Sequence, residues 1–366
     1  MVLTNYWWLL IWIFLFGGIS LAFIPKREEI VLGKPARHWG KLSAFALALP
    51  YVIWAGWRTD AFGDTGMYRQ TFRNMPTGWA NLGAYLQSRP KDPGFTVLEY
   101  FIKTVISDSP VVFFLIIASI QIYLLARIYR KYSSNFWLSM FLFVASTDYL
   151  SWVHNGMRQF LAATIIFAAI PLLIEKRYIL MVAVVLFASL IHASALFFLP
   201  FIFIVNGDAW NSRTILFIFG LILSVYFLEE VTGFITDSME DTVYEGDIVF
   251  FKTDNGTNLF RVLFYSVPTA LSLLYRRRIE AEDDPLINLC VNLSIISTGV
   301  YVFSFFTSGI LIGRLPIYFS LTNYILIPWL IKELFTAESG LLVQGGFIAT
   351  YVAFFYFQVG KTWKLL

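Results

Sequence analysis

The sequence predicts an all-α polytopic membrane protein with about 12 transmembrane helices. Hydrophobic residues make up 58% of the 366 residues and charged residues 14%, whereas a typical soluble domain has about 25% charged residues. The mean hydropathy is +0.68. The apolar residues fall in runs of roughly 17–22, the length that a helix needs to cross a bilayer. Such runs are too long and too uniformly apolar for membrane β-strands, so a helical bundle is expected.

The first half of the chain contains five of the predicted spans. They are expected at about residues 4–24, 41–57, 110–128 and 136–150, and from the polar stretch 151–161 to residue 174. Residues 25–40 are expected to form a loop. The polar segment 58–109 is punctuated by Gly and Pro, and we expect an external loop whose short helices lie on the membrane surface.

The segment 178–205 allows two interpretations, because His192-Ala193-Ser194 interrupts nearly 30 apolar residues. It is either one overlong helix or two short helices folded at His192. Short loops rich in Lys and Arg lie on the cytoplasmic side. Two crossings put the basic clusters at 26–27, 127–131, 176–177, 276–278 and 332 on one side, so we predict two.

The remaining spans complete a single transmembrane domain that covers residues 1–366. They are expected at about residues 214–228, 259–275, 286–306, 315–331 and 341–357. Both termini are then on the outer face, and residues 229–258 form a second external loop. That loop carries eight acidic residues and one basic residue, Lys252, so it should repel anions.

Several classes of function are disfavoured by composition and motifs. The single cysteine, Cys290, has no partner for an internal disulfide, and the net charge of +3 is too small to suggest nucleic acid binding. Residues 4–24 lack the basic start and the cleavage site of a signal peptide. No Walker loop, zinc spacing or nucleophile elbow is present. Asp60, Asp64 and Asp92 are possible divalent-ion ligands, but no spacing demands one, so neither metal nor cofactor is expected.

Cations and ionisable groups stand at the outer start of four predicted inward-running helices. These are Arg158, His192, Arg261 and Arg314. A cation there opposes both the positive-inside bias and the helix dipole, which disfavours it by roughly 0.3–1 kcal/mol. Two interpretations stay open. Each Arg can snorkel to lipid phosphates, or several can converge with free helix N–H groups to hold a diphosphate.

Two histidines and an acid–phenol pair are candidates for proton transfer. His154 and His192 are the histidines expected on the outer side, and histidine is a common general base near neutral pH. Asp64 and Tyr68 lie one helical turn apart in the first external loop. The alternatives are satisfied structural histidines and a helix cap at Asp64.

Four short motifs together resemble one known family. In order, they are Asp64-x-x-x-Tyr68, Pro93-Gly94-Phe95, Asn155-Gly156-Met157-Arg158-Gln159 and Ala188-Ser189-Leu190-Ile191-His192-Ala193-Ser194-Ala195-Leu196. This set is similar to the EpsG family of exopolysaccharide membrane proteins, which is related to Wzy-type polysaccharide polymerases. The resemblance covers about residues 60–200, with Gly313-Arg314 beyond. Asp92 departs from the Glu expected before Pro-Gly.

The resemblance implies a GT-C-like bundle and a glycosyltransferase at the outer face of a bacterial inner membrane. Such a polymerase joins oligosaccharide repeat units carried on undecaprenyl diphosphate, without metal. Its partners are that substrate and membrane lipid, and whether a chain-length regulator binds stays open. The competing class is a lipid-linked oligosaccharide flippase or another polytopic transporter, although carriers place charge near the midplane rather than at one edge.

The resemblance and the residue chemistry together suggest roles for particular side chains. The candidate catalytic residues are His192, Arg158 and Asp64, with His192 or Asp64 as the base. The leaving diphosphate needs preorganised positive charge, and the candidates are Arg158, Arg314 and Arg261. The candidate sugar-binding residues are Tyr68, Arg69, Trp152, His154, Gln159, Trp79 and Tyr85.

Overall fold

The computed structural model describes residues 5–24, 26–240, 242 and 244–366. Thr4, the expected first residue of the first span, lies outside this part. The chain is 75% helical with one small hairpin, which confirms the all-α membrane class. It divides into two compact units. Unit 1 comprises residues 1–168, 188–193 and 327–366, and unit 2 comprises residues 169–187 and 194–326.

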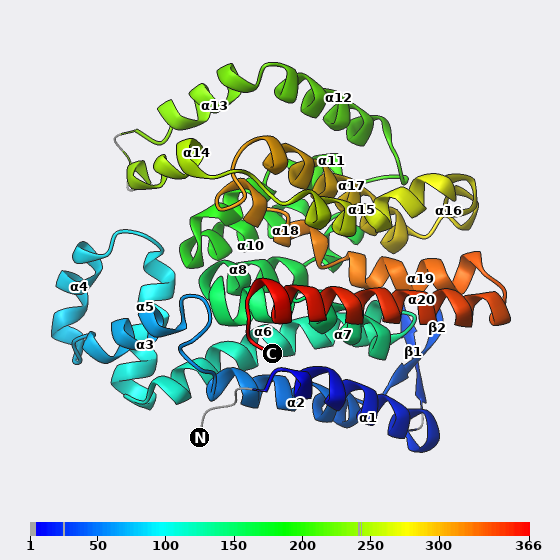
Figure 1. The fold of residues 1–366 in the computed structure, drawn as a ribbon, viewed down its shortest axis with the longest axis horizontal. Coiled ribbons are helices and arrows are strands. Elements are labelled where there is room, and N and C mark those ends of the chain that lie inside the picture. Colours follow the sequence, from blue (N-terminus) through cyan, green and yellow to red (C-terminus); the bar gives the residue numbers. More distant parts are fainter. Residues whose placement is uncertain (1–4, 25, 241, 243) are drawn as a thin grey trace. The chain divides into compact units, whose positions relative to one another are not determined.

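Unit 1 is built around α6 (Pro110–Tyr132), which packs against α2 and α8 (Figure 1). At about 1.5 Å per residue, its 23 residues are about 35 Å long, enough to cross a hydrocarbon core. The other elements that begin in this unit are α1 (Trp7–Phe23), β1 (Lys26–Val31), β2 (Lys34–Trp39), α2 (Lys41–Gly56), α3 (Thr65–Asn74), η1 (Trp79–Asn81), α4 (Leu82–Ser88), α5 (Pro93–Phe101), η2 (Ile102–Ile106), α7 (Phe136–Ala145), η3 (Tyr149–Asn155), α8 (Met157–Ala168), α20 (Ala337–Phe355) and η7 (Tyr356–Thr362).

Unit 2 is built around α17 (Pro285–Phe306), which is largely buried and packs against α12 and α15. The other elements that lie wholly or partly in it are α9 (Pro171–Ile174), α10 (Tyr178–Ile191), η4 (Ala193–Phe198), α11 (Phe201–Ile204), α12 (Ser212–Tyr226), α13 (Leu228–Asp237), η5 (Glu245–Asp247), α14 (Val249–Thr253), α15 (Leu259–Leu274), α16 (Arg276–Glu282), η6 (Ile312–Arg314), α18 (Ile317–Ser320) and α19 (Asn323–Leu334). The division between units falls within α10, next to η4 at Ala193, and within α19.

Fewer helices than predicted have full spanning length, because two of the helix pairs in the described residues are bent and five apolar helices are only 10–17 residues long. Four helices in the described residues are long and apolar enough to cross a membrane, or six if each bent pair is one span. The predicted span 136–150 ends as a helix at Ala145 and continues as η3 after a 68° bend. Five shorter apolar helices accompany these, and the count of about twelve crossings stays a prediction.

The predicted break at His192 is confirmed as a feature of the backbone. The helix α10 ends at Ile191, and the 3-10 turn η4 begins at Ala193. The predicted short helices of loop 58–109 are also present as α3, α4 and α5. Their position at the membrane surface, and the sidedness of the loops 58–109 and 229–258, stay predictions.

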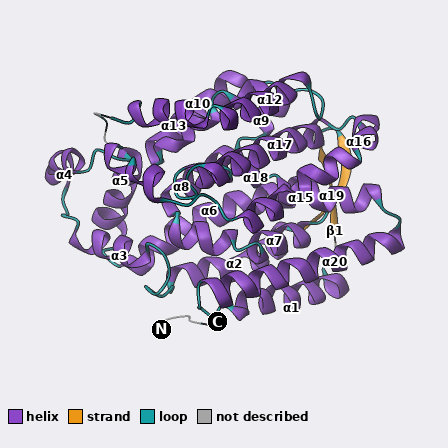
Figure 2. Ribbon diagram, turned by 45° about the horizontal axis from the view of Figure 1, so that its top comes forward, coloured by secondary structure: helices purple, strands orange, loops and turns teal. Residues whose placement is uncertain are grey.

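The segment 25–40, expected to be a loop, contains an antiparallel hairpin of β1 and β2 (Figure 2). Arg130, at the end of α6, holds it by donating to both carboxylate oxygens of Glu29 at 2.9 and 3.0 Å and to the Trp39 carbonyl at 2.9 Å. This paired guanidinium–carboxylate contact is a long-range interaction, so local sequence pattern did not predict it.

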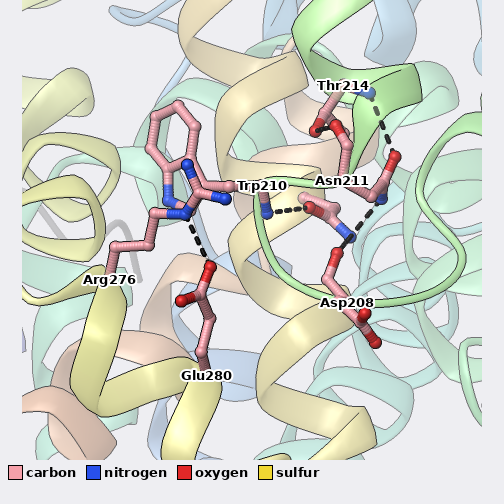
Figure 3. Close-up of polar contacts among 7 residues, drawn as sticks. Asp208, Trp210, Asn211, Thr214, Arg276 and Glu280 are labelled. Atoms are coloured by element: carbon pink, nitrogen blue, oxygen red, sulfur yellow. Dashed lines mark hydrogen bonds and ion pairs between the residues drawn. The ribbon is translucent and has the colours of Figure 1, made fainter.

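Asn292 on α17 holds the connection between α11 and α12 in unit 2. Its side-chain amide donates to the carbonyls of Val205 at 2.9 Å and Asp208 at 3.0 Å, and its oxygen accepts from the Trp210 N–H at 3.1 Å. Asn211, which Figure 3 labels together with Asp208, Trp210 and Thr214, caps α12 by accepting from the N–H groups of Arg213 and Thr214. One fully buried amide therefore satisfies three backbone groups.

Asn292→Ala is expected to lower the midpoint of thermal unfolding in detergent by roughly 5–10 °C, because buried backbone groups lose their partners. Asn288→Ala is the matched control one turn earlier on α17. That side chain is also buried but donates one 3.3 Å bond to Asp283, so a smaller shift is expected. Equal shifts for the two variants would contradict the bracing role of Asn292.

Candidate active site

The first turn of α8 is positioned by a buried arginine that the sequence analysis did not single out. Arg58 is 1% exposed, and its guanidinium lies 3.8 Å from the centre of the Phe114 ring. It donates to the Val153 carbonyl near the end of η3, and its other terminal nitrogen contacts the Met157 sulfur at 3.3 Å. Arg58 therefore holds the end of η3 and the start of α8, immediately before Arg158.

The Asp64 motif docks on the Asn155 motif. The Asp64 N–H donates to the Asn155 side-chain oxygen at 3.1 Å, and the Thr65 hydroxyl donates to the His154 carbonyl at 3.2 Å. Asp64 occupies the N-cap position of α3, but its side chain makes no capping hydrogen bond. The backbone thus brings Asp64 to the Asn155–Gln159 motif, with its carboxylate not engaged as the helix cap.

Asp92 connects the Asn155–Gln159 motif to the Ala188–Leu196 motif. One carboxylate oxygen forms a 2.8 Å ion pair with Arg158, and the other accepts the Ala193 N–H at 3.2 Å. The Asp92 side chain is 5% exposed, whereas that of Arg158 is 32% exposed. Asp92 therefore joins the start of α5 to the start of α8 and to the residue after His192, and all of these residues belong to unit 1.

Gly94 permits the start of α5 to approach the end of α10. A Cβ atom at position 94 would lie 2.8 Å from both the carbonyl oxygen and the Cβ of Leu190. Because backbone atoms cannot rotate away, a side chain at this position would force the two segments apart. The Pro93-Gly94-Phe95 motif and the Ala188–Leu196 motif are thus in contact through a glycine.

Gly94→Ala is expected to destabilise the protein by about 1–3 kcal/mol, the usual range for overpacking, and to displace Asp92 from Arg158. The midpoint of thermal unfolding in detergent measures the first effect. Gly83→Ala, in α4, has nothing within 4 Å of the new Cβ, so the helix-favouring alanine should be neutral or stabilising. A Gly94→Ala protein as stable as the Gly83→Ala protein would contradict the contact.

Tyr68 and Glu99 extend the site beside Arg158. The Tyr68 ring centre lies 6.0 Å from the Arg158 guanidinium, and burial raises the pKa of this phenol while Arg158 opposes the change. Glu99 is 3% exposed, and one of its oxygens has no hydrogen-bond partner among the described residues. Burial raises the pKa of Glu99 to about 7, against the opposing charges of Arg158 and Arg89.

Glu99 was missed by the sequence analysis, although a signal was available. The buried face of α5 consists of Phe95, Thr96, Glu99 and Tyr100, and residues four apart share a helix face. An acid on the apolar face of an amphipathic helix indicates either a partner or a shifted pKa. The site therefore contains two acidic side chains. Asp92 is paired with Arg158, and Glu99 has a pKa of about 7.

The predicted sugar-binding residues are divided by their exposure. Trp152, His154 and Gln159 are 3%, 0% and 5% exposed, so they lie beneath the surface and do not present a wall to a sugar in this conformation. Arg69 pairs with Asp60 at 2.8 Å. By contrast, Trp79 is 55% exposed.

Trp79 and Tyr85 share an aromatic cluster near Glu99. Their ring centres lie 6.3 and 5.9 Å from that of Tyr100, which follows Glu99 on α5. An exposed aromatic ring supported by a buried one is a suitable surface for the apolar face of a sugar. Within unit 1, Trp79 and Tyr85 are therefore the better-exposed of the predicted sugar contacts.

Arg261 and Arg314 belong to unit 2 and come from neighbouring segments of it. A Cβ atom on Gly313 would lie 2.3 Å from the Thr257 hydroxyl oxygen, so the start of η6 touches the loop that enters α15. Arg261 lies 5.6 Å from the centre of the Tyr265 ring. The fold thus brings the segments that carry these two predicted diphosphate ligands side by side, and Arg158 lies in unit 1.

Comparison with known proteins identifies a family but no individual relative. No curated protein and no solved structure is significantly similar to this chain. The family model of the EpsG family matches residues 41–362 of 366, a range that includes every candidate residue described above. This chain therefore belongs to the EpsG family, a family of Wzy-like polysaccharide polymerase-type proteins.

Proposed function

We propose that this protein is a glycosyltransferase that polymerises oligosaccharide repeat units carried on undecaprenyl diphosphate. Family membership supports a polymerase-type role in polysaccharide biosynthesis. We further propose that it acts at the outer face of a bacterial inner membrane. The observation that carries the proposal is that Asp92, directly before the Pro93 motif, joins two further motifs by binding both Arg158 and the Ala193 N–H.

The proposed reaction exchanges one bond at an anomeric carbon. The acceptor hydroxyl of a fresh repeat unit attacks the anomeric carbon of the growing chain, and a new glycosidic bond forms. The bond between that carbon and the lipid diphosphate breaks, and undecaprenyl diphosphate leaves with the bonding electron pair. The hydroxyl proton passes to the base, for which His192 is the first candidate and Asp64 the second.

Arg158 is proposed to stabilise the charge that develops on the leaving diphosphate. A fixed guanidinium at a helix start places positive charge where negative charge appears, and it does so without reorganisation during the reaction. Arg261 and Arg314 are proposed as further anion ligands of unit 2. Trp79 and Tyr85 are the proposed sugar contacts. The buried side chains are proposed to support the site from within, and they are Tyr68, Trp152, His154 and Gln159.

The decisive experiment uses purified protein and a chemically defined lipid-linked repeat unit. A ladder of products that differ by one repeat unit, formed without added nucleotide sugar, is the expected result. The transporter alternative is tested in vesicles with the same substrate. Movement of the unit across the bilayer without any ladder would reject the polymerase and favour a flippase.

A further inference from the structure

Two hydrogen-bond donors from distant parts of unit 1 converge on the Asp92 carboxylate. The Arg158 guanidinium binds one oxygen at 2.8 Å, and the Ala193 N–H binds the other at 3.2 Å. A guanidinium together with a backbone N–H is a donor set that also suits phosphate oxygens. The carboxylate therefore occupies a position with the donors of an anion site.

The Asp92 side chain has a local alternative that it does not use. Asp92 stands at the N-cap position of α5, where an aspartate commonly accepts an N–H of the first turn. Its side chain makes no such bond, and its backbone is left-handed, with a φ of 55°. The carboxylate is instead directed to Arg158 and Ala193, so its orientation is set by the anion-binding donors rather than by its own helix.

The two partners differ in their access to solvent. Asp92 is almost completely buried, but about a third of the Arg158 side chain is exposed. An anion that approaches from outside can therefore reach the guanidinium first. To reach the Ala193 N–H as well, it must take the place of the Asp92 carboxylate, because like charges cannot share the same donors without repulsion.

We propose that Arg158 and the Ala193 N–H form a phosphate-binding site that Asp92 fills until a lipid diphosphate displaces it. This inference deepens the proposed function, on which the identity of the ligand rests. Asp92 then acts as an internal competitor, and displacement releases the Asp92–Ala193 contact next to His192. Substrate binding would thus loosen the segment that carries the candidate base at the moment the diphosphate is held.

The test measures the affinity of the full-length protein in detergent for farnesyl diphosphate, a sugar-free polyprenyl diphosphate. Asp92→Asn keeps the shape and an acceptor for Ala193 but removes the charge. Asp92→Ser is a second neutral variant, whose hydroxyl can cap α5. Both should bind the probe roughly three- to tenfold more tightly than the wild type. In these variants no carboxylate charge has to leave the site before the probe binds, so a larger fraction of the protein is competent to bind. Arg158→Gln should bind at least about tenfold more weakly.

Asp60→Asn is the matched control, because it removes the 2.8 Å ion pair between Asp60 and Arg69. Both residues lie in the loop 58–109, which also contains Asp92. It should leave the affinity for this sugar-free probe unchanged. Unchanged or weaker binding by both Asp92 variants would overturn the competitor role, and unchanged binding by Arg158→Gln would overturn the site itself. Failure of the polymerase proposal would appear separately, as the absence of a ladder from the lipid-linked repeat unit.

Discussion

Replacement of Arg158 by alanine is expected to lower the rate of chain extension by about 10²–10³-fold, the usual cost of removing one preorganised electrostatic contact to a developing charge. Arg158 is partly exposed at the start of α8, so it is the cation of unit 1 best placed to meet a leaving diphosphate. The initial rate of ladder formation by purified protein measures the effect directly. In cells, the same variant should yield short polymer at a matched protein level.

Arg276→Ala provides the matched control for this prediction. Arg276 also forms an ion pair with a carboxylate, at 2.7 Å to Glu280, but both side chains are well exposed (Figure 3). Its loss should change the rate by less than about twofold, because exposed ion pairs contribute little. Wild-type rates for the Arg158→Ala protein, with normal folding, would remove Arg158 from the mechanism.

Most helices of this protein could be predicted from sequence, because long apolar runs identify them without tertiary information. The predicted spans 41–57 and 286–306 correspond to α2 and α17 within one residue at each end. The break at His192 was predicted from a polar triplet in an apolar run. The bend within the span 136–150 was not predicted. It falls where Thr147 adopts a φ of 70°, which apolar composition does not encode.

The site was only partly predictable, because its contacts join residues far apart in the chain. Arg158 and His192 were recognised from their anomalous position at helix starts. The partner that links them, Asp92, is 66 residues from Arg158 and 101 residues from Ala193, and no local pattern encodes that pairing. In the sequence, Asp92 stood out as a departure from the family pattern and as a carboxylate without a role.

Burial was the second quantity that sequence could not supply. Trp152, His154 and Gln159 share the polar stretch with Arg158 and therefore appeared equally able to contact a sugar. The π-helical turn η3 instead directs Trp152 and His154 inward, where His154 packs edge-on against Tyr149 with ring centres 5.3 Å apart. Glu99 differs from these residues, because its place on the apolar face of α5 was a signal in the sequence, although no motif marked it.

Glu99→Gln is expected to stabilise the protein at pH 8 and to have little effect near pH 4.5. The pKa of Glu99 is about 7 in the folded state and 4.5 at its ordinary value. Between these values the folded state binds more protons, so the free energy of unfolding falls as the pH rises. Glutamine is neutral at every pH and escapes this loss, which is on the order of 3 kcal/mol above pH 7. Thermal unfolding of both proteins across this pH range measures it, with Glu240→Gln, at an exposed site, as the matched control. A constant difference for Glu99→Gln would show that Glu99 is ionised in the fold. Below pH 7, protonated Glu99 adds no negative charge beside Arg158, so Asp92 is the ionised carboxylate with which an incoming diphosphate competes there.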